Sequence, residues 1–287
     1  EESGRYSFIA FDPIASLEGD EHFSIFQKSG EGAQLSSEPV IDVLQKVMPT
    51  FSGEVPFSFF GGAIGHFSYE TAYHFEHIAT PHENKLEIPD VHVFFYEKFI
   101  VIDHIYQTAS IVVIDLFDAS YTDEQLQQEV ERIEQQIMKQ NCFTEAKSYE
   151  LQFSTTVDKN HFLKMVEKAK EHIVKGDIFQ VVLSQAFEAD FNGNPFDLYR
   201  KLRTSNASPY MFYVDFGSYI VLGTSPESLV KVNGNVVTTN PIAGTKRRGK
   251  SKDEDEKIAS ALLQDEKELA EHKMLVDLGR NDIGRVS

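Results

Sequence analysis

Tryptophan is missing from the 287-residue chain, and cysteine occurs only once. A single thiol, Cys142, can form neither a disulfide within the chain nor a zinc site built from several cysteines. Long apolar runs are missing too, because no stretch approaches the roughly 18 apolar residues of a membrane span, and no signal peptide is recognisable. These absences are compatible with the cytoplasm, so we expect a cytoplasmic protein with no membrane partner.

Basic residues are also scarce. The chain has 27 Lys and Arg against 45 Asp and Glu, which gives a net charge of −18. Such a surface repels phosphate backbones, so we expect no nucleic-acid partner. An acidic protein that binds a small anion must build a local positive site. Aromatic residues are abundant, with 23 Phe and 11 Tyr, and their alternating segments favour β-strands.

The apolar pattern changes near the middle of the chain. Residues 1–118 favour strands, and residues 123–140 have the spacing of an amphipathic helix. A polar stretch over residues 140–156 follows. We therefore predict an N-terminal β-rich domain over residues 1–145 and a second domain over residues 146–287.

The second half alternates helices with strands. A helix is expected to begin after Asp158, whose side chain can cap it, and to end at Gly176. We predict a buried strand over residues 178–189 and a final helix over residues 252–280. Between them we expect a helix that starts at Pro195, strands at 209–216 and 218–224 joined at Gly217, and a hairpin around Asn233-Gly234.

A glycine-containing turn follows that hairpin, in NPIAGTKRRG (240–249). Ala243 and Gly244 leave space for a ligand against main-chain amides, and Thr245 adds a hydroxyl donor. The Lys-Arg-Arg run that follows concentrates positive charge. The segment suits a small carboxylate ligand, although its composition is equally typical of a turn beside a solvated basic run.

A second constellation lies in DEKELAEHKMLVDLGRND (265–282). On a helix, Asp265, Glu268, Glu271 and His272 are three or four residues apart, so their side chains share one face. Clustered carboxylates repel one another unless a cation or water lies among them, and hard oxygen ligands suit Mg²⁺. Spacing alone, however, more often indicates a solvated acidic face.

These segments, taken in order, resemble the chorismate-binding enzymes. The resemblance implies an α+β fold in which two large, mainly antiparallel sheets pack over a core with helices outside. Family members continue beyond the last motif, so we also expect that the chain is incomplete and turns over no chorismate by itself. The matching segments cover most of the chain: RYSFIAFDP (5–13), FFGGAIGHFSYE (59–70), GDIFQVVLSQ (176–185), SPYMFYVDF (208–216), GTSPESLV (223–230), NPIAGTKRRG (240–249) and DEKELAEHKMLVDLGRNDIGRV (265–286).

Two positions favour the anthranilate synthase branch of this family. Gln180 stands where isochorismate and salicylate synthases have a lysine, which serves as the base that water needs to become a nucleophile; ammonia needs no such base. Ala243 stands where aminodeoxychorismate synthases have a lysine that attacks the ring. Both positions therefore fit direct amination of chorismate at C2.

The resemblance also assigns roles to individual residues. It implies that Glu271 binds Mg²⁺ directly, that Glu268 is a nearby catalytic carboxylate acting on the metal through water, and that Gly244 and Thr245 contact chorismate. The resemblance also implies a tryptophan inhibitor site, to which Pro209, Tyr210 and Met211 contribute. The N-terminal segment that completes this site in the family is not recognisable here. These three residues lie in a segment that composition alone would place in a core strand. Ammonia is expected from a separate glutamine amidotransferase subunit.

Other interpretations remain open at this point. The chain also resembles the aminodeoxychorismate and the isochorismate or salicylate branches. A different class of function is a non-catalytic, tryptophan-binding regulatory fragment. A β-rich interaction domain would require the glycine turn and the acidic helix to coincide by chance.

Overall fold

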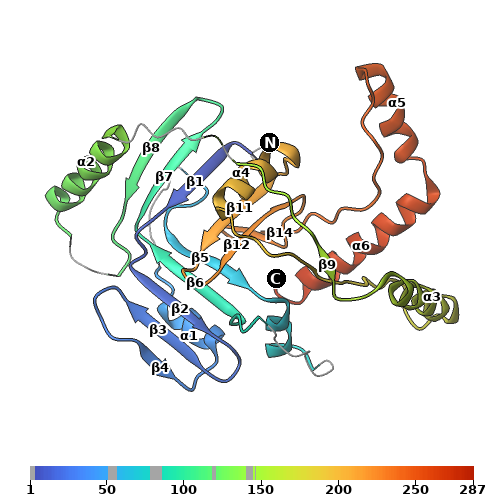
Figure 1. Cartoon of the computed structure of the whole chain (residues 1–287), viewed down its shortest axis with the longest axis horizontal. Helices are drawn as coiled ribbons and strands as arrows, with labels where there is room; N and C mark the ends of the chain where they lie inside the picture. The colour runs from blue at the N-terminus through green and yellow to red at the C-terminus, as the bar shows by residue number, and fades with distance from the viewer. Residues whose placement is uncertain (1–3, 51–56, 78–85, 118–120, 140–144, 146) are drawn as a thin grey trace. The chain divides into compact units, whose positions relative to one another are not determined.

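The computed structural model describes residues 4–50, 57–77, 86–117, 121–139, 145 and 147–287. It divides the chain into two compact units, Glu1–Phe143 and Thr144–Ser287. Antiparallel sheets and helices make up both, which confirms the α+β class (Figure 1). Cys142 lies outside the described residues. No helix in the described ranges is long and apolar enough to cross a membrane.

The first unit is built around a five-stranded antiparallel sheet in the order β4-β3-β2-β6-β5. Helix α1 (Val40–Val47) packs on it, and Leu17, Val40 and Phe95 are fully buried in the core between them. Apolar residues at alternate positions of β2 and β6 supply most of this core, as the two-residue period of a strand requires. The strands are β2 (Ala15–Gly19), β3 (Ser24–Lys28), β4 (Gln34–Ser36), β5 (Gly62–Phe67) and β6 (Val91–Tyr96).

A second sheet of the same unit has the order β1-β7-β8. Its strands are β1 (Tyr6–Ala10), β7 (Lys98–Asp103) and β8 (Thr108–Val113). Helix α2 (Asp123–Lys139) packs against β8 and buries Ile133. This confirms the helix expected over residues 123–140. A short 3₁₀ helix, η1 (Tyr69–His74), follows β5.

Strand β5 contains a glycine that lies close to the backbone of the neighbouring strand. A Cβ atom at Gly65 would lie 1.9 Å from the main-chain oxygen of His92 on the neighbouring strand β6. No side chain fits at that separation. Position 65 therefore requires glycine for the two strands to pair.

The second unit contains short antiparallel pairs and four helices within its described residues. Helix α3 begins after Asp158, which accepts the main-chain N–H groups of Asn160 and His161, and it ends at Gly176 with a φ of 79°. These ends confirm the sequence prediction. The elements are β9 (Ser154–Thr155), α3 (Lys159–Lys175), β10 (Phe187–Glu188), α4 (Pro195–Ser205), β11 (Tyr210–Asp215), β12 (Ile220–Ser225), β13 (Lys231–Asn233), β14 (Val236–Thr238), α5 (Lys252–Leu262) and α6 (Glu266–Gly284).

Both predicted strand pairs of this unit are confirmed. Strands β11 and β12 pair antiparallel on either side of Gly217, and β13 pairs with β14. The tight turn between β13 and β14 consists of Gly234 and Asn235, because Asn233 already pairs with Val236. Helix α4 starts at Pro195, as expected.

The buried strand expected over residues 178–189 is wrong. Only Phe187 and Glu188 of this range pair, with β9, and the side chains of Phe179 and Val182 are 90% and 81% exposed. A strand needs neighbours for its N–H and C=O groups and for its apolar side chains, and residues 178–186 have no paired strand within the described part of the chain.

The single helix expected over residues 252–280 is also wrong, because the structure has two helices there. Helix α5 ends at Leu262 and α6 starts at Glu266. Asp265 lies at the break, where its carboxylate accepts the main-chain N–H of Glu268 at 3.3 Å. An aspartate that caps a new helix competes with continuation of the previous one.

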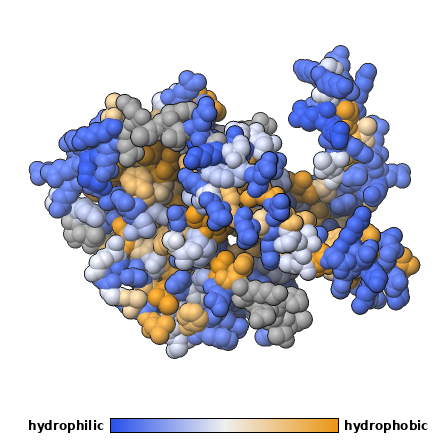
Figure 2. Space-filling model, in the orientation of Figure 1, coloured by the Kyte–Doolittle hydropathy of each residue, from blue (hydrophilic) through white to orange (hydrophobic). Residues whose placement is uncertain are grey.

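Hydrophilic side chains cover much of α2, α3 and α5, and a few apolar side chains are exposed on α3 (Figure 2). Leu163, Ile173 and Val174 of α3 are 51%, 44% and 87% exposed. No residue of α3 is fully buried within the part of the chain that the structure describes.

Replacing Gly65 by alanine should destabilise the first unit by about 2 kcal/mol or more, because the new methyl group meets main-chain atoms that cannot rotate away. Gly32→Ala is the matched control, since a Cβ atom there meets nothing within 4 Å. Its effect should stay within about 0.5 kcal/mol. Urea denaturation followed by circular dichroism measures both; equal effects would contradict the close-packing argument.

Candidate functional site

The predicted turn follows strand β14 and carries no regular secondary structure from residue 239 to residue 249. Gly244 has a φ of 78°, in the left-handed region that favours glycine. Ala243 and Gly244 are half-buried, whereas Thr245 is exposed. The turn thus presents main-chain groups and a hydroxyl group without a large side chain over them.

The start of helix α6 lies against this turn. A Cβ atom at Gly244 would lie 2.9 Å from Glu268 Oε2 and 3.4 Å from Leu262 Cδ1. Further along the same helix, a Cβ atom at Gly279 would lie 3.1 Å from Thr239 Cγ2. Two glycines, one on each segment, therefore allow the turn and the helix to meet. The structure in this way brings together two segments that are more than 20 residues apart in the sequence.

Asp265 is the cap of α6 and not a member of its acidic face, which corrects the expectation that it lies in one row with Glu268, Glu271 and His272. Lys246 of the turn reaches the same carboxylate, with 3.5 Å between Nζ and Asp265 Oδ2. The N–H of Glu268 that Asp265 accepts lowers the pKa of Asp265, and Lys246 adds to this effect. The cap therefore also ties the turn to the helix.

Glu268, Glu271 and His272 are half-buried on α6. Glu268 and Glu271 lie one helical turn apart, which places both carboxylates on the same side of the helix. Within the described ranges, no three His, Cys, Asp or Glu side chains converge well enough to hold a metal ion. Mg²⁺ needs fewer protein ligands, since it is held by one or two carboxylates together with water and substrate oxygens. Glu268 and Glu271 fit that smaller set.

The basic run is largely paired with carboxylates. Arg248 Nε donates to Asp255 Oδ1 at 2.8 Å, and Lys246 lies beside Asp265. Of the three cations, Arg247 alone has no carboxylate partner among the residues that the structure describes. An anion at the turn would thus be met mainly by main-chain N–H groups, Thr245 and Arg247.

Sequence reasoning missed Glu227. Its Oε1 accepts the main-chain N–H of Ile242 at 3.2 Å, next to Ala243. The Ser225 hydroxyl in turn donates to the main-chain oxygen of Glu227 at 2.9 Å. The segment GTSPESLV (223–230) therefore supports the turn directly. The Ser-Pro pair after a strand was the available signal, since it indicates a loop with local side-chain hydrogen bonds.

The remaining predicted residues lie apart from these contacts. Gln180 is exposed in the unpaired segment 178–186, and no described hydrogen bond joins it to the turn. Pro209 is exposed, Tyr210 is 39% exposed and Met211 is half-buried at the start of β11. Tyr210 pairs with Ser225 across β11 and β12, two residues before Glu227.

The chain matches the chorismate binding enzyme family over residues 2–287 and belongs to that family. It is 40% identical to anthranilate synthase component 1 of Acetivibrio thermocellus, with 100% of this chain and 61% of the relative covered. The corresponding Lactococcus lactis protein is 38% identical, with 100% and 63% covered. The crystal structure of anthranilate synthase component I from Streptococcus pneumoniae is 37% identical, with a TM-score of 0.87 over 99% of this chain and 62% of that chain. The chain thus spans about three fifths of the length of these relatives.

The contact between the turn and α6 can be tested by a double-mutant cycle. Gly244→Ala should cost about 1–2 kcal/mol from backbone strain, plus the displacement of the Glu268 carboxylate. In a Glu268→Ala background no carboxylate has to be displaced, so Gly244→Ala should cost less. The coupling free energy between the two substitutions should be about 0.5 kcal/mol or more.

Gly234→Ala is the matched control for this cycle. Gly234 also has a positive φ, 56°, but a Cβ atom there meets nothing within 4 Å. Its effect on the free energy of unfolding should be additive with that of Glu268→Ala. Additivity for Gly244→Ala as well would show that the turn and the carboxylate do not touch.

Proposed function

We propose that the whole protein containing this chain is the component I of an anthranilate synthase, which converts chorismate and ammonia to anthranilate and pyruvate for tryptophan synthesis. The observation that carries this proposal is the contact of Gly244 with Glu268 in a member of the chorismate-binding family. Relatives with the printed name anthranilate synthase component 1, at 38–40% identity along the full chain, support the choice of branch.

Chorismate carries carboxylates, and the turn is suited to receive one. The main chain at Gly244 and the hydroxyl of Thr245 contact the substrate, while Arg247 adds positive charge. Glu227 keeps the turn in place through its hydrogen bond to Ile242. Because the other cations of the run already face carboxylates, recognition depends on directed hydrogen bonds more than on net charge.

Glu271 and Glu268 would hold Mg²⁺, Glu271 directly and Glu268 through water. When bound, the ion supplies Lewis-acid polarisation beside the substrate carboxylate. The half-buried position of Glu268 against the turn keeps its carboxylate next to the place where that group would lie. The two glutamates thereby link substrate binding to metal binding.

The choice of ammonia as the nucleophile follows from the absence of a lysine at positions 180 and 243. Gln180 is not a base that would activate water, and Ala243 is not an amine that would attack the ring. Ammonia adds at C2 while the C4 hydroxyl leaves, which gives aminodeoxyisochorismate. Pyruvate is then eliminated and the ring becomes aromatic.

Two further parts of the proposal concern partners. Ammonia comes from glutamine in a separate amidotransferase subunit, the component II of the enzyme. Tryptophan inhibits by binding at a site to which Pro209, Tyr210 and Met211 contribute, at the exposed start of β11. That position is accessible to a small molecule in the described unit.

The product identifies the branch. The whole protein, given chorismate, Mg²⁺ and ammonium, should release anthranilate, which is measured by its fluorescence and by chromatography. A reaction without ammonium is the control. Isochorismate, salicylate or 4-amino-4-deoxychorismate as the main product would sink the assignment.

A Mg²⁺ titration of activity tests the glutamates. Glu271→Gln should weaken Mg²⁺ binding and lower activity by orders of magnitude, because a charged ligand is lost without a change of shape. Glu268→Gln should weaken metal affinity less, since its contact passes through water. Glu266→Gln is the matched control, an exposed glutamate in the same first turn of α6. Three variants with wild-type rates would leave α6 as a solvated acidic face.

A further inference from the structure

The first unit contains a small cavity between helix α2 and strands β7 and β8, far along the sequence from the turn at Gly244. It has a volume of about 130 Å³. Its polar lining comes from Glu97, Lys98, Tyr121, Gln125 and Glu129. Leu126 and Val113 supply apolar walls. None of the contacts proposed for chorismate, Mg²⁺ or tryptophan involves these residues.

Glu97 is the unusual member of this lining. Glu97 is only 2% exposed, although its side chain carries a carboxyl group. One oxygen, Oε1, accepts the main-chain N–H of Leu116 at 2.9 Å. Burial raises the pKa of Glu97, and nearby Asp115 raises it further, against the opposing effects of the Leu116 hydrogen bond and Lys98. An ionised carboxylate this deeply buried is costly unless a cation accompanies it.

Lys98 is adjacent but is already committed to another group. Its Nζ lies 2.6 Å from Glu129 Oε1. Glu129 also accepts two hydrogen bonds from Arg132, which lowers the pKa of Glu129 to about 2 together with Lys98. Glu129 therefore stays ionised and holds Lys98. Among the residues that line the cavity, Glu97 is the carboxyl group with no ion-pair partner in the described part of the chain.

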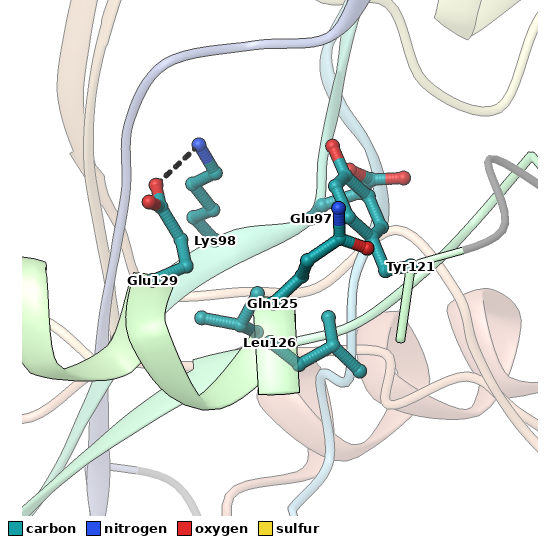
Figure 3. Close-up of a pocket in the computed structure, with 7 residues that line it drawn as sticks. Glu97, Lys98, Tyr121, Gln125, Leu126 and Glu129 are labelled. Carbon is teal, nitrogen blue, oxygen red and sulfur yellow. Dashed lines mark ion pairs between the residues drawn. The ribbon is translucent and has the colours of Figure 1, made fainter. Parts of the chain in front are cut away.

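Figure 3 shows that the lining of the cavity has two separate groups of polar side chains. The Lys98–Glu129 ion pair lies to one side of the close-up, and Glu97, Tyr121 and Gln125 lie on the other. The second group offers carboxylate and phenol oxygens, which accept hydrogen bonds, whereas the Gln125 amide oxygen already accepts the main-chain N–H of Thr122 at 2.8 Å. Leu126 lies below them. A donor-rich, positively charged group with a short apolar part matches this lining.

We propose that this cavity is a binding site for a small primary ammonium compound, with Glu97 as its counter-ion. Its volume corresponds to roughly four water molecules, which suits methylammonium or a similarly small amine. Pockets for larger organic ligands start at roughly 300 Å³, so an amino acid with an aromatic side chain is excluded. The site goes beyond the proposed function and does not depend on it.

The charge state of Glu97 sets the pH at which the ligand binds. A carboxyl group whose pKa is raised on folding stabilises the protein below its ordinary pKa of 4.5, and that contribution is lost as the pH rises through the raised value. Above that value the folded protein holds a buried negative charge. A cation in the cavity offsets this cost, so the ligand should stabilise the protein at pH 8 and not at pH 4.

Thermal unfolding of the 287-residue chain tests the site at pH 8. Increasing methylammonium chloride should raise the Tm of the first unit by several degrees over sodium chloride of equal ionic strength, because only the folded state has the cavity. Glu97→Gln keeps an acceptor for the Leu116 N–H but removes the charge, and it should abolish the shift. Glu134→Gln is the control, an exposed glutamate on helix α2 of the same unit, and it should keep the full shift.

Tetramethylammonium, which has no N–H donor and is larger, should give no shift beyond that of sodium. If Glu97→Gln does not fold, Leu126→Phe serves instead, since it fills the cavity and leaves the Glu97 carboxyl in place; it too should lose the shift. A shift of equal size in wild type and in the folded variant, or no shift over sodium chloride in wild type, would overturn the proposal.

Discussion

The close approach of helix α6 to the turn at Gly244 is the contact on which the candidate site depends. It exists because position 244 has no side chain, so the Glu268 carboxylate can lie where a methyl group would be. Asp265 strengthens the contact, since it caps the helix and faces Lys246 of the turn at the same time. A turn that offers main-chain donors and a helix that offers carboxylates thus become one surface. The proposed binding of substrate and Mg²⁺ rests on this surface.

Charge pairing explains how an acidic chain can carry this surface. The chain has a net charge of −18, and most of the cations near the turn are already balanced by aspartates. In the proposed function, anion recognition then falls to directed hydrogen bonds, which depend on geometry more than on the overall field. Glu97 illustrates the opposite case. It is a buried carboxyl whose neighbouring lysine is held by another glutamate, so its charge is left for a ligand to balance.

Local patterns predicted much of the fold. The capped helix between Asp158 and Gly176, the helix that starts at Pro195 and the hairpin turn at Gly234 depend on neighbours a few residues away, and the structure has all three. The strand expected over residues 178–189 failed because pairing is not local: an apolar, β-branched segment forms a strand only beside another strand. The prediction of one continuous helix failed at Asp265, because the helical spacing of apolar residues continues through a residue that caps a new helix.

The sequence by itself determined the family, the types of residue available to the site and the order of its segments, because these follow from motifs that are read along the chain. Only the tertiary structure decided which of those residues meet. It placed Glu268 against Gly244, gave Asp265 the role of a cap, and added Glu227, whose hydrogen bond to Ile242 joins residues 15 positions apart. It also buried Glu97 beneath α2, in a segment that has only the alternating pattern of a strand. Motifs report residue types, whereas distances between separate segments depend on packing, and packing is a property of the folded chain.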